Sequence, residues 1–188
     1  GGVHGTAVAS VIGAPVNGIG LVGIYPSVTL RTYDASLGDG TRLPSSDIAA
    51  GIEAAAHAGR SVINLSLGSN QPDPAITNAI DDAVRLGSLV VAASGNSGQE
   101  GNPLSYPAAD PHVLTVAATD RNDQPASFSS QSQYVDIAAP GVDITVATAL
   151  DNSYAPESGT SFASPIVAAK SSATVGSSTS AFRSRRLR

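Results

Sequence analysis

Short runs of apolar, often β-branched residues alternate along this chain with alanine-rich segments of helical character. Such short runs are typical of buried strands, and the segments between them carry helix start and stop signals. A strand, helix, strand, helix order favours a parallel sheet with helices on both faces. We therefore predict an α/β protein of three layers, α/β/α, with a mainly parallel sheet. The predicted strands are residues 28–33, 61–65, 88–93, 113–117, 134–138 and 143–147, and the predicted helices are residues 46–58, 74–86 and one starting near residue 159.

The first predicted helix shows its boundaries most clearly. Pro44 precedes it, Ser45 or Ser46 can cap its free N–H groups, and Asp47 suits the positive end of the helix dipole. Gly59 can end it. In a parallel sheet, functional sites form at the carboxyl ends of the strands, so the residues that follow each predicted strand are the first candidates.

The composition fits one globular domain and excludes several kinds of chemistry. The chain has 188 residues, of which 41% are hydrophobic and 13% charged, enough to bury a sizeable core. It has no cysteine, which excludes disulfides, thiolate metal sites and a thiol nucleophile. The net charge of −5 argues against nucleic acid or an anionic membrane as a partner. No apolar run reaches the ~18 residues of a membrane span, and we expect a monomer.

The composition changes after Ala169. From Lys170 onward the chain is rich in serine and holds five of its ten Lys and Arg residues. Because such a segment cannot bury an apolar face, we expect residues 1–169 to form the domain and residues 170–188 to be a disordered tail. We interpret the tail as a foreign or frame-shifted end, with an interaction segment as the alternative. The chain starts without Met or a signal-like segment, so we expect a processed chain or a fragment.

Ser161 has a setting that suits a nucleophile. Gly159 and Thr160 precede it at the start of a predicted helix, where backbone N–H groups and the positive end of the helix dipole are available. An attacking serine needs such a setting, because negative charge develops on the carbonyl oxygen that it attacks. An ordinary helix N-cap is the alternative interpretation of the same residues.

Asn96 and His4 are candidates of the same kind. Asn96 follows a predicted buried strand between small residues, so its amide can reach over a cleft and donate to an oxyanion, although a plain Asn-Gly turn has the same pattern. His4 has small neighbours that allow other groups to approach its imidazole. His57, on a predicted helix surface, is interpreted as structural or solvated. His112 follows Asp110-Pro111 just before a predicted strand and is interpreted as a turn residue.

Four motifs, in this order along the chain, resemble blocks of the subtilase family of serine proteases. Residues 4–9 (HGTAVA) resemble its histidine block, residues 62–68 (VINLSLG) its substrate-edge strand, and residues 94–96 (SGN) its oxyanion-asparagine block. Residues 159–165 (GTSFASP) are nearly identical to its nucleophile block. His4 precedes Asn96 by 92 residues and Ser161 by 157, intervals close to those of subtilisin. The resemblance extends to about Ala169 and implies a subtilisin-like fold.

The resemblance implies a role for each of these residues in serine endopeptidase chemistry. Ser161 would attack the peptide carbonyl, and His4 would take its proton and pass it to the leaving amine. Asn96 and the Ser161 N–H would hold the oxyanion, where losing one donor costs on the order of 3 kcal/mol. The polypeptide substrate would pair as an added strand with Ser66, Leu67 and Gly68. Residues 38–42, with Gly38 and Gly40, would line its other side, and Ala93, Ser94 and Gly95 would form part of the pocket for the residue before the cleaved bond.

The resemblance also implies a location and a possible metal site. It implies secretion and a catalytic mechanism without a cofactor. Residues 15–21 resemble the calcium loop of the family, in which Asn17 would offer a side-chain oxygen and Ile19 and Leu21 backbone carbonyls. Calcium prefers six to eight oxygens, usually with a carboxylate, and this loop has no Asp or Glu. A structural calcium ion is therefore the weaker expectation.

One expected part of the catalytic machinery is missing. The family has an Asp about 32 residues before the His, and here three residues precede His4. That carboxylate fixes the His tautomer, and its removal costs roughly 10⁴-fold in rate. The fold would also lack the N-terminal strand and part of the C-terminal helices, leaving an apolar strand edge exposed. We therefore expect this chain alone to be a poor protease of marginal stability.

Two other functions remain as alternatives. The first is an inactive pseudoprotease or fragment that keeps the cleft as a peptide-binding module. The second is a different serine α/β hydrolase. The sequence lacks a Gly-x-Ser-x-Gly elbow, and His4 precedes Ser161, opposite to the order of that class.

Overall fold

The computed structural model describes residues 2–36, 42–148, 153–175 and 178–183. The described part contains a six-stranded sheet in the order β1-β8-β2-β3-β4-β5, in which every neighbouring pair is parallel. A separate antiparallel pair is formed by β6 and β7. The elements are α1 (Gly2–Gly13), β1 (Leu30–Asp34), α2 (Ser45–His57), β2 (Ser61–Leu65), α3 (Pro74–Arg85), β3 (Leu89–Ala93), the 3₁₀ turn η1 (Gly98–Glu100), β4 (Val113–Thr119), β5 (Ile137–Pro140), β6 (Ile144–Ala147), β7 (Tyr154–Glu157), α4 (Thr160–Val175) and β8 (Ser178–Arg183).

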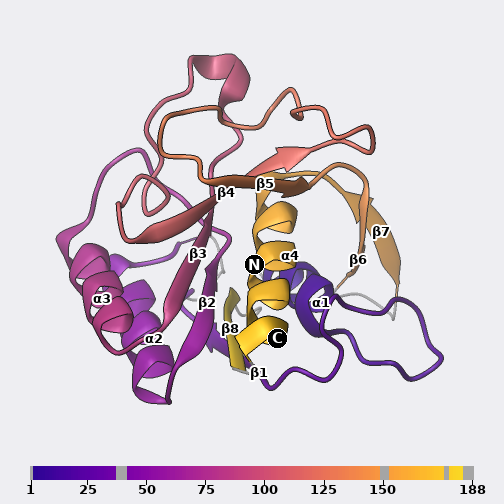
Figure 1. Ribbon diagram of the computed structural model, residues 1–188, viewed down its shortest axis with the longest axis horizontal. Helices are drawn as coiled ribbons and strands as arrows, with labels where there is room; N and C mark the ends of the chain where they lie inside the picture. Colours follow the sequence, from indigo (N-terminus) through magenta and orange to yellow (C-terminus); the bar gives the residue numbers. More distant parts are fainter. Residues whose placement is uncertain (1, 37–41, 149–152, 176–177, 184–188) are drawn as a thin grey trace.

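The helices cover both faces of the sheet, as the sequence predicts (Figure 1). On one face, α2 and α3 pack over Ile63 and Val90. On the other face, α4 packs over Val62 and Val91. Neighbouring residues of β2 and β3 thus point to opposite layers, which explains why all five residues of β2 are buried. α1 lies beside α4, and the two helices bury a third apolar cluster that includes Val8 and Phe162.

Most predicted elements are confirmed, with shifts at their ends. β2 has the predicted bounds, α3 and β3 differ from theirs by one residue at one end, and α2 differs by one residue at each end. β5 lies later than predicted, at Ile137–Pro140. β6 was predicted as a strand but pairs with β7 outside the main sheet. No helix of the described part is both long and apolar enough to cross a membrane.

Helix capping differs from the sequence prediction. α2 begins at Ser45, so neither Ser45 nor Ser46 caps it; the N-cap position is Pro44, which offers no side-chain hydrogen bond. The cap with a side chain lies on α3 instead. There Asp73 accepts the N–H groups of Ala75 and Ile76, and these hydrogen bonds satisfy donors that the first turn of a helix leaves free.

The segment after Ala169 also differs from the predicted tail. α4 continues through Lys170 to Val175, and residues 178–183 form β8. β8 lies between β1 and β2 and pairs with both. Without it, the facing edges of β1 and β2 would present unpaired N–H and C=O groups inside the sheet. This strand thus covers the strand edge that the sequence predicts to be exposed. A serine-rich segment can take this place because strand pairing uses backbone groups and depends little on side-chain composition.

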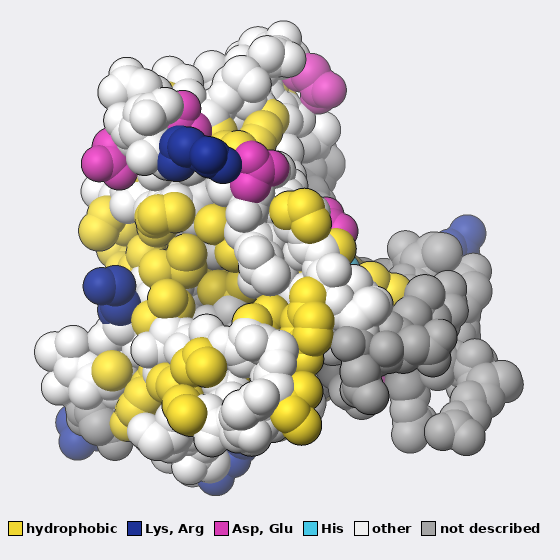
Figure 2. Space-filling view, turned by 90° about the vertical axis from the view of Figure 1, so that its right-hand side faces the viewer, with side chains coloured by type: hydrophobic (Ala, Val, Ile, Leu, Met, Phe, Trp, Pro, Cys, Tyr) yellow, Lys and Arg dark blue, Asp and Glu magenta, His cyan; other side chains and the backbone are white. Residues whose placement is uncertain are grey.

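One face of the molecule keeps a large apolar surface. Figure 2 shows hydrophobic side chains gathered around a hollow on the face that lies to the right in Figure 1. The loop after α1 contributes to the exposed apolar surface of the protein, since Val16 is 75% exposed and Ile19 66%. Exposed apolar area of this kind adds nothing to folding stability.

Candidate active site

Ser161 lies in the first turn of α4, at the carboxyl edge of the parallel sheet. Thr160 opens the helix and is 1% exposed, and Ser161 is half-buried. Gly159, just before the helix, leaves space for Asn96: a Cβ at Gly159 would lie 3.4 Å from the Asn96 amide nitrogen. The chain therefore presents the Ser161 hydroxyl at a helix N-terminus, beside an amide side chain from a different element.

Asn96 is held in place through its carbonyl oxygen. Oδ1 of Asn96 accepts hydrogen bonds from the backbone N–H and from the hydroxyl of Thr160, both at 2.9 Å. The Thr160 hydroxyl also accepts the Gly95 N–H at 3.2 Å. Both hydrogen bonds use Oδ1, and Nδ2 of Asn96 makes no hydrogen bond among the described residues, so its protons are available as donors. This is the arrangement that an oxyanion donor requires.

Thr160 is thus a residue whose importance the sequence did not reveal. Its position between Gly159 and Ser161 predicted only a helix start. In the structure, its hydroxyl joins the segment after β3 to the start of α4. A threonine directly before a candidate nucleophile was the one available signal, and nothing in the sequence pairs it with Asn96.

A second hydrogen-bond network fixes Ser161 from the other side. The fully buried Asn64 of β2 accepts the Ser164 hydroxyl at 2.8 Å and donates to the Ser66 hydroxyl at 3.0 Å. Ser66 in turn donates to the Ser161 carbonyl at 2.8 Å. This network ties the end of β2 to the first turn of α4, and it includes two residues, Asn64 and Ser164, that the sequence had not assigned to the site.

His4 lies in the first turn of α1, close to the Ser66 end of this network. Its Nε2 is 3.2 Å from the Ser66 carbonyl oxygen, and its ring meets that of Phe162 edge-on at a centroid distance of 5.8 Å. In the tautomer that makes this hydrogen bond, Nε2 carries the proton. Among the residues that the structure describes, no hydrogen bond joins His4 to Ser161 and no carboxylate pairs with the imidazole.

The predicted substrate-binding residues fall into three groups. Leu67, Gly68, Ala93 and Gly95 line a cavity of about 220 Å³ that Asn96, Thr160 and Ser161 also border. Ser66 borders a second cavity of about 360 Å³ on the other side of Leu67 and Gly68. Ser94 is fully buried behind the first cavity. Gly38 and Gly40 lie outside the described residues.

The wall behind the first cavity is polar and well ordered by hydrogen bonds. Ser94 donates to the Ser130 carbonyl, and its own carbonyl accepts the Tyr134 hydroxyl at 3.1 Å. Partial burial raises the pKa of the Tyr134 phenol above its ordinary value. The phenol is therefore neutral at physiological pH and serves as a hydrogen-bond donor.

The loop predicted to bind calcium supplies only part of a calcium site. Oδ1 of Asn17, its one candidate side-chain ligand, accepts the Ile19 N–H at 3.0 Å in a local turn. Residues 15–21 contain no carboxylate, and Asn17 and Ile19 are exposed. Calcium needs six to eight oxygen ligands. Asn17, Ile19 and Leu21 can supply only part of that number, and no step of the chemistry depends on them.

The fold and the site together define a class: a three-layer α/β protein that presents a serine at a helix N-terminus beside an amide donor. The model of the subtilase family matches residues 1–181. The chain belongs to the subtilase family.

Curated relatives and solved structures agree with this assignment. The chain is 45% identical over 165 residues to Subtilisin BL of Lederbergia lenta, covering 88% of this chain and 60% of that protein. It is 44% identical to Subtilisin Savinase of Lederbergia lenta, with the same coverage. The S41 psychrophilic protease superposes with a TM-score of 0.79 at 35% identity, covering 93% of this chain and 64% of that one. The chain thus spans about 60% of the length of these curated relatives.

Proposed function

We propose that the protein is a serine endopeptidase that hydrolyses peptide bonds and uses no cofactor for catalysis. Ser161 is the nucleophile, His4 the general base, and Asn96 with the Ser161 N–H the oxyanion hole. The observation that carries the proposal is the pair of 2.9 Å hydrogen bonds from Thr160 to Asn96. They hold the amide donor against the N-terminus of the helix that bears Ser161, where the charge of the transition state develops.

The substrate is an extended polypeptide. Residues 66–68 continue β2 past the sheet. All three border the 360 Å³ cavity, and Leu67 and Gly68 also border the 220 Å³ cavity, so a peptide added along them would place successive side chains on alternate sides. The 220 Å³ cavity next to Ser161 would take the residue before the cleaved bond. We further infer from the family that the protein acts outside the cell as a monomer.

His4 must turn before it can act as the base. The proton of Ser161 has to reach an unprotonated ring nitrogen, whereas Nε2 here faces the Ser66 carbonyl. A carboxylate that binds the other ring nitrogen would fix the productive tautomer, and the described residues place none there. This geometry favours a second candidate function, a peptide-binding module without turnover.

Labelling with a fluorophosphonate probe separates the two functions. The chain is compared with Ser161→Ala and with Ser46→Ala, a matched change of an exposed serine on α2. Labelling that is lost in Ser161→Ala and kept in Ser46→Ala supports an activated nucleophile. A folded chain that does not label, yet binds an extended peptide, would establish the binding module instead.

A further inference from the structure

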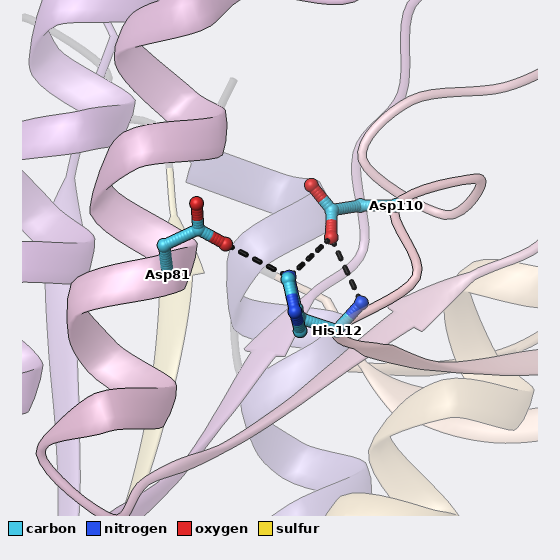
Figure 3. A group of neighbouring side chains, drawn as sticks. All are labelled: Asp81, Asp110 and His112. Carbon is cyan, nitrogen blue, oxygen red and sulfur yellow. Dashed lines mark hydrogen bonds and ion pairs between the residues drawn. The ribbon is translucent and has the colours of Figure 1, made fainter.

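A second group of reactive side chains lies on the opposite side of the sheet from α4. Asp81 comes from α3, and Asp110 and His112 come from the segment that leads into β4 (Figure 3). Nδ1 of His112 lies 2.8 Å from Oδ1 of Asp81 and 3.5 Å from Oδ1 of Asp110. One ligand atom from each residue lies within 4.8 Å of the other two. We propose that these three side chains bind a divalent transition-metal ion, for which Zn²⁺ is the best match.

Asp110 separates this group from an ordinary surface ion pair. Its side chain is 6% exposed, and a carboxylate buried to this extent needs compensation for lost hydration. Its Oδ1 accepts the His112 backbone N–H at 2.9 Å. Its Oδ2 receives no hydrogen bond, and no Lys or Arg pairs with it, among the residues that the structure describes. Asp110 also borders the 360 Å³ cavity. The backbone N–H of His112 and, when its ring is protonated, Nδ1 supply part of this compensation through Oδ1. A bound cation would supply the rest.

The set of donor atoms selects the kind of ion. One imidazole nitrogen and two carboxylate oxygens are ligands that Zn²⁺ accepts, whereas calcium and magnesium prefer oxygen alone. Two carboxylates with a neutral imidazole also balance the charge of a divalent ion. Because Asp81 and His112 are about half exposed, water can complete the coordination from the solvent side.

The distances are close to those of a tetrahedral zinc site. Bonds of about 2.1 Å place neighbouring ligands about 3.4 Å apart. The 3.5 Å between Nδ1 of His112 and Oδ1 of Asp110 meets this requirement as it stands. The Asp81 carboxylate, now hydrogen-bonded to Nδ1, would have to withdraw by about 0.6 Å. Asp81 is 47% exposed on a helix surface, which allows that movement.

The ion would join two elements that are distant in the sequence. α3 would be linked through Asp81 to the segment that ends in β4. That segment also contains Tyr106, whose N–H and carbonyl pair with Ser69 beside the 360 Å³ cavity. Binding would therefore stabilise the folded chain at an edge of the proposed peptide cleft, through contacts that do not involve Ser161.

Titration of the metal-free 188-residue chain with ZnCl₂ in a calorimeter tests the proposal. We expect one Zn²⁺ per chain, and at least a tenfold weaker affinity in His112→Ala and in Asp81→Asn. His57→Ala removes an exposed histidine whose ring contacts only a backbone carbonyl among the described residues, and it should bind like the unchanged chain. Asp81→Asn changes a surface residue, so this variant should fold. Circular dichroism checks that a loss of Zn²⁺ binding does not come from unfolding.

Two outcomes would overturn the site. One is a folded chain that takes up no Zn²⁺; the other is undiminished binding in folded His112→Ala and Asp81→Asn. The calorimetric readout is independent of proteolysis. A chain that binds no Zn²⁺ would therefore not contradict the proposed endopeptidase function, and a chain that does not label with fluorophosphonate would not contradict the metal site.

Discussion

Replacing Thr160 with valine tests how the two halves of the candidate active site are joined. Valine has nearly the same shape as threonine, so the packing of a residue that is 1% exposed is kept while its hydroxyl is removed. Two hydrogen bonds are lost, the one to Oδ1 of Asn96 at 2.9 Å and the one from the Gly95 N–H at 3.2 Å. The Thr160 backbone N–H remains as the only described donor to Asn96.

The size of the effect follows from these two hydrogen bonds. The Gly95 N–H is part-buried and would lose its partner, at a cost of about 1–3 kcal/mol in the free energy of unfolding. The lost hydrogen bond to Asn96 is worth about 0.5–1.5 kcal/mol. If that amount is lost from the transition state, the rate of fluorophosphonate labelling falls by about 2-fold to 10-fold.

Urea unfolding and labelling rates measure both quantities. Thr145→Val, at an exposed position of β6, is the matched control and should change neither. In an Asn96→Ala background, Thr160→Val should lose its effect on labelling while keeping part of its effect on stability, because the labelling effect passes through Asn96. Unchanged stability and labelling in Thr160→Val would refute this account of the site.

Three further changes give expected outcomes. Ser164→Ala leaves Oδ1 of the fully buried Asn64 without its donor and should lower the free energy of unfolding by about 1–3 kcal/mol in urea titrations. Hydrogen bonds from Ser45 and from backbone N–H groups hold the pKa of Asp73 below its ordinary value of 3.8. The ionised Asp73 carboxylate thus adds to the free energy of unfolding above pH ~4, and this addition disappears as the pH falls through the lowered pKa. The free energy of unfolding of Asp73→Asn should therefore equal that of the unchanged chain only in acid. A chain ending at Val175 lacks β8, and we expect analytical ultracentrifugation to show aggregates. Monodisperse folded material would argue against the role of β8 in joining β1 to β2.

The sequence predicted the middle of the parallel sheet well because β2 and β3 are buried on both faces. β3 is a continuous apolar run and β2 is largely apolar, and such runs have few other places in a folded protein. β5 was harder to place, because it is short and mostly exposed, so its residues carry little periodic signal. β6 was placed within one residue, but its pairing with β7 outside the main sheet was not predicted. β8 could not be predicted at all, since its place depends on an opening between β1 and β2 that only the assembled sheet defines.

The candidate site divides in the same way. Ser161, Asn96 and His4 were proposed from short motifs and their intervals, and the structure brings Asn96 beside the turn that carries Ser161. The supporting residues Thr160, Asn64 and Ser164 were missed, because a hydroxyl or amide gains its role from a partner 64 to 100 residues away. The orientation of His4 toward the Ser66 carbonyl is likewise a three-dimensional property.

The position of β8 between β1 and β2 has a consequence for how the chain folds. β8 pairs Thr179 with Leu30 and with Val62, so contacts inside the sheet join residues that are far apart along the chain. During synthesis, β1 and β2 emerge long before their common neighbour exists. β1 and β2 therefore keep unpaired edges until residue 183 has left the ribosome. Long-range closure of this kind is slow, and during the delay chaperones have the longest access to the chain.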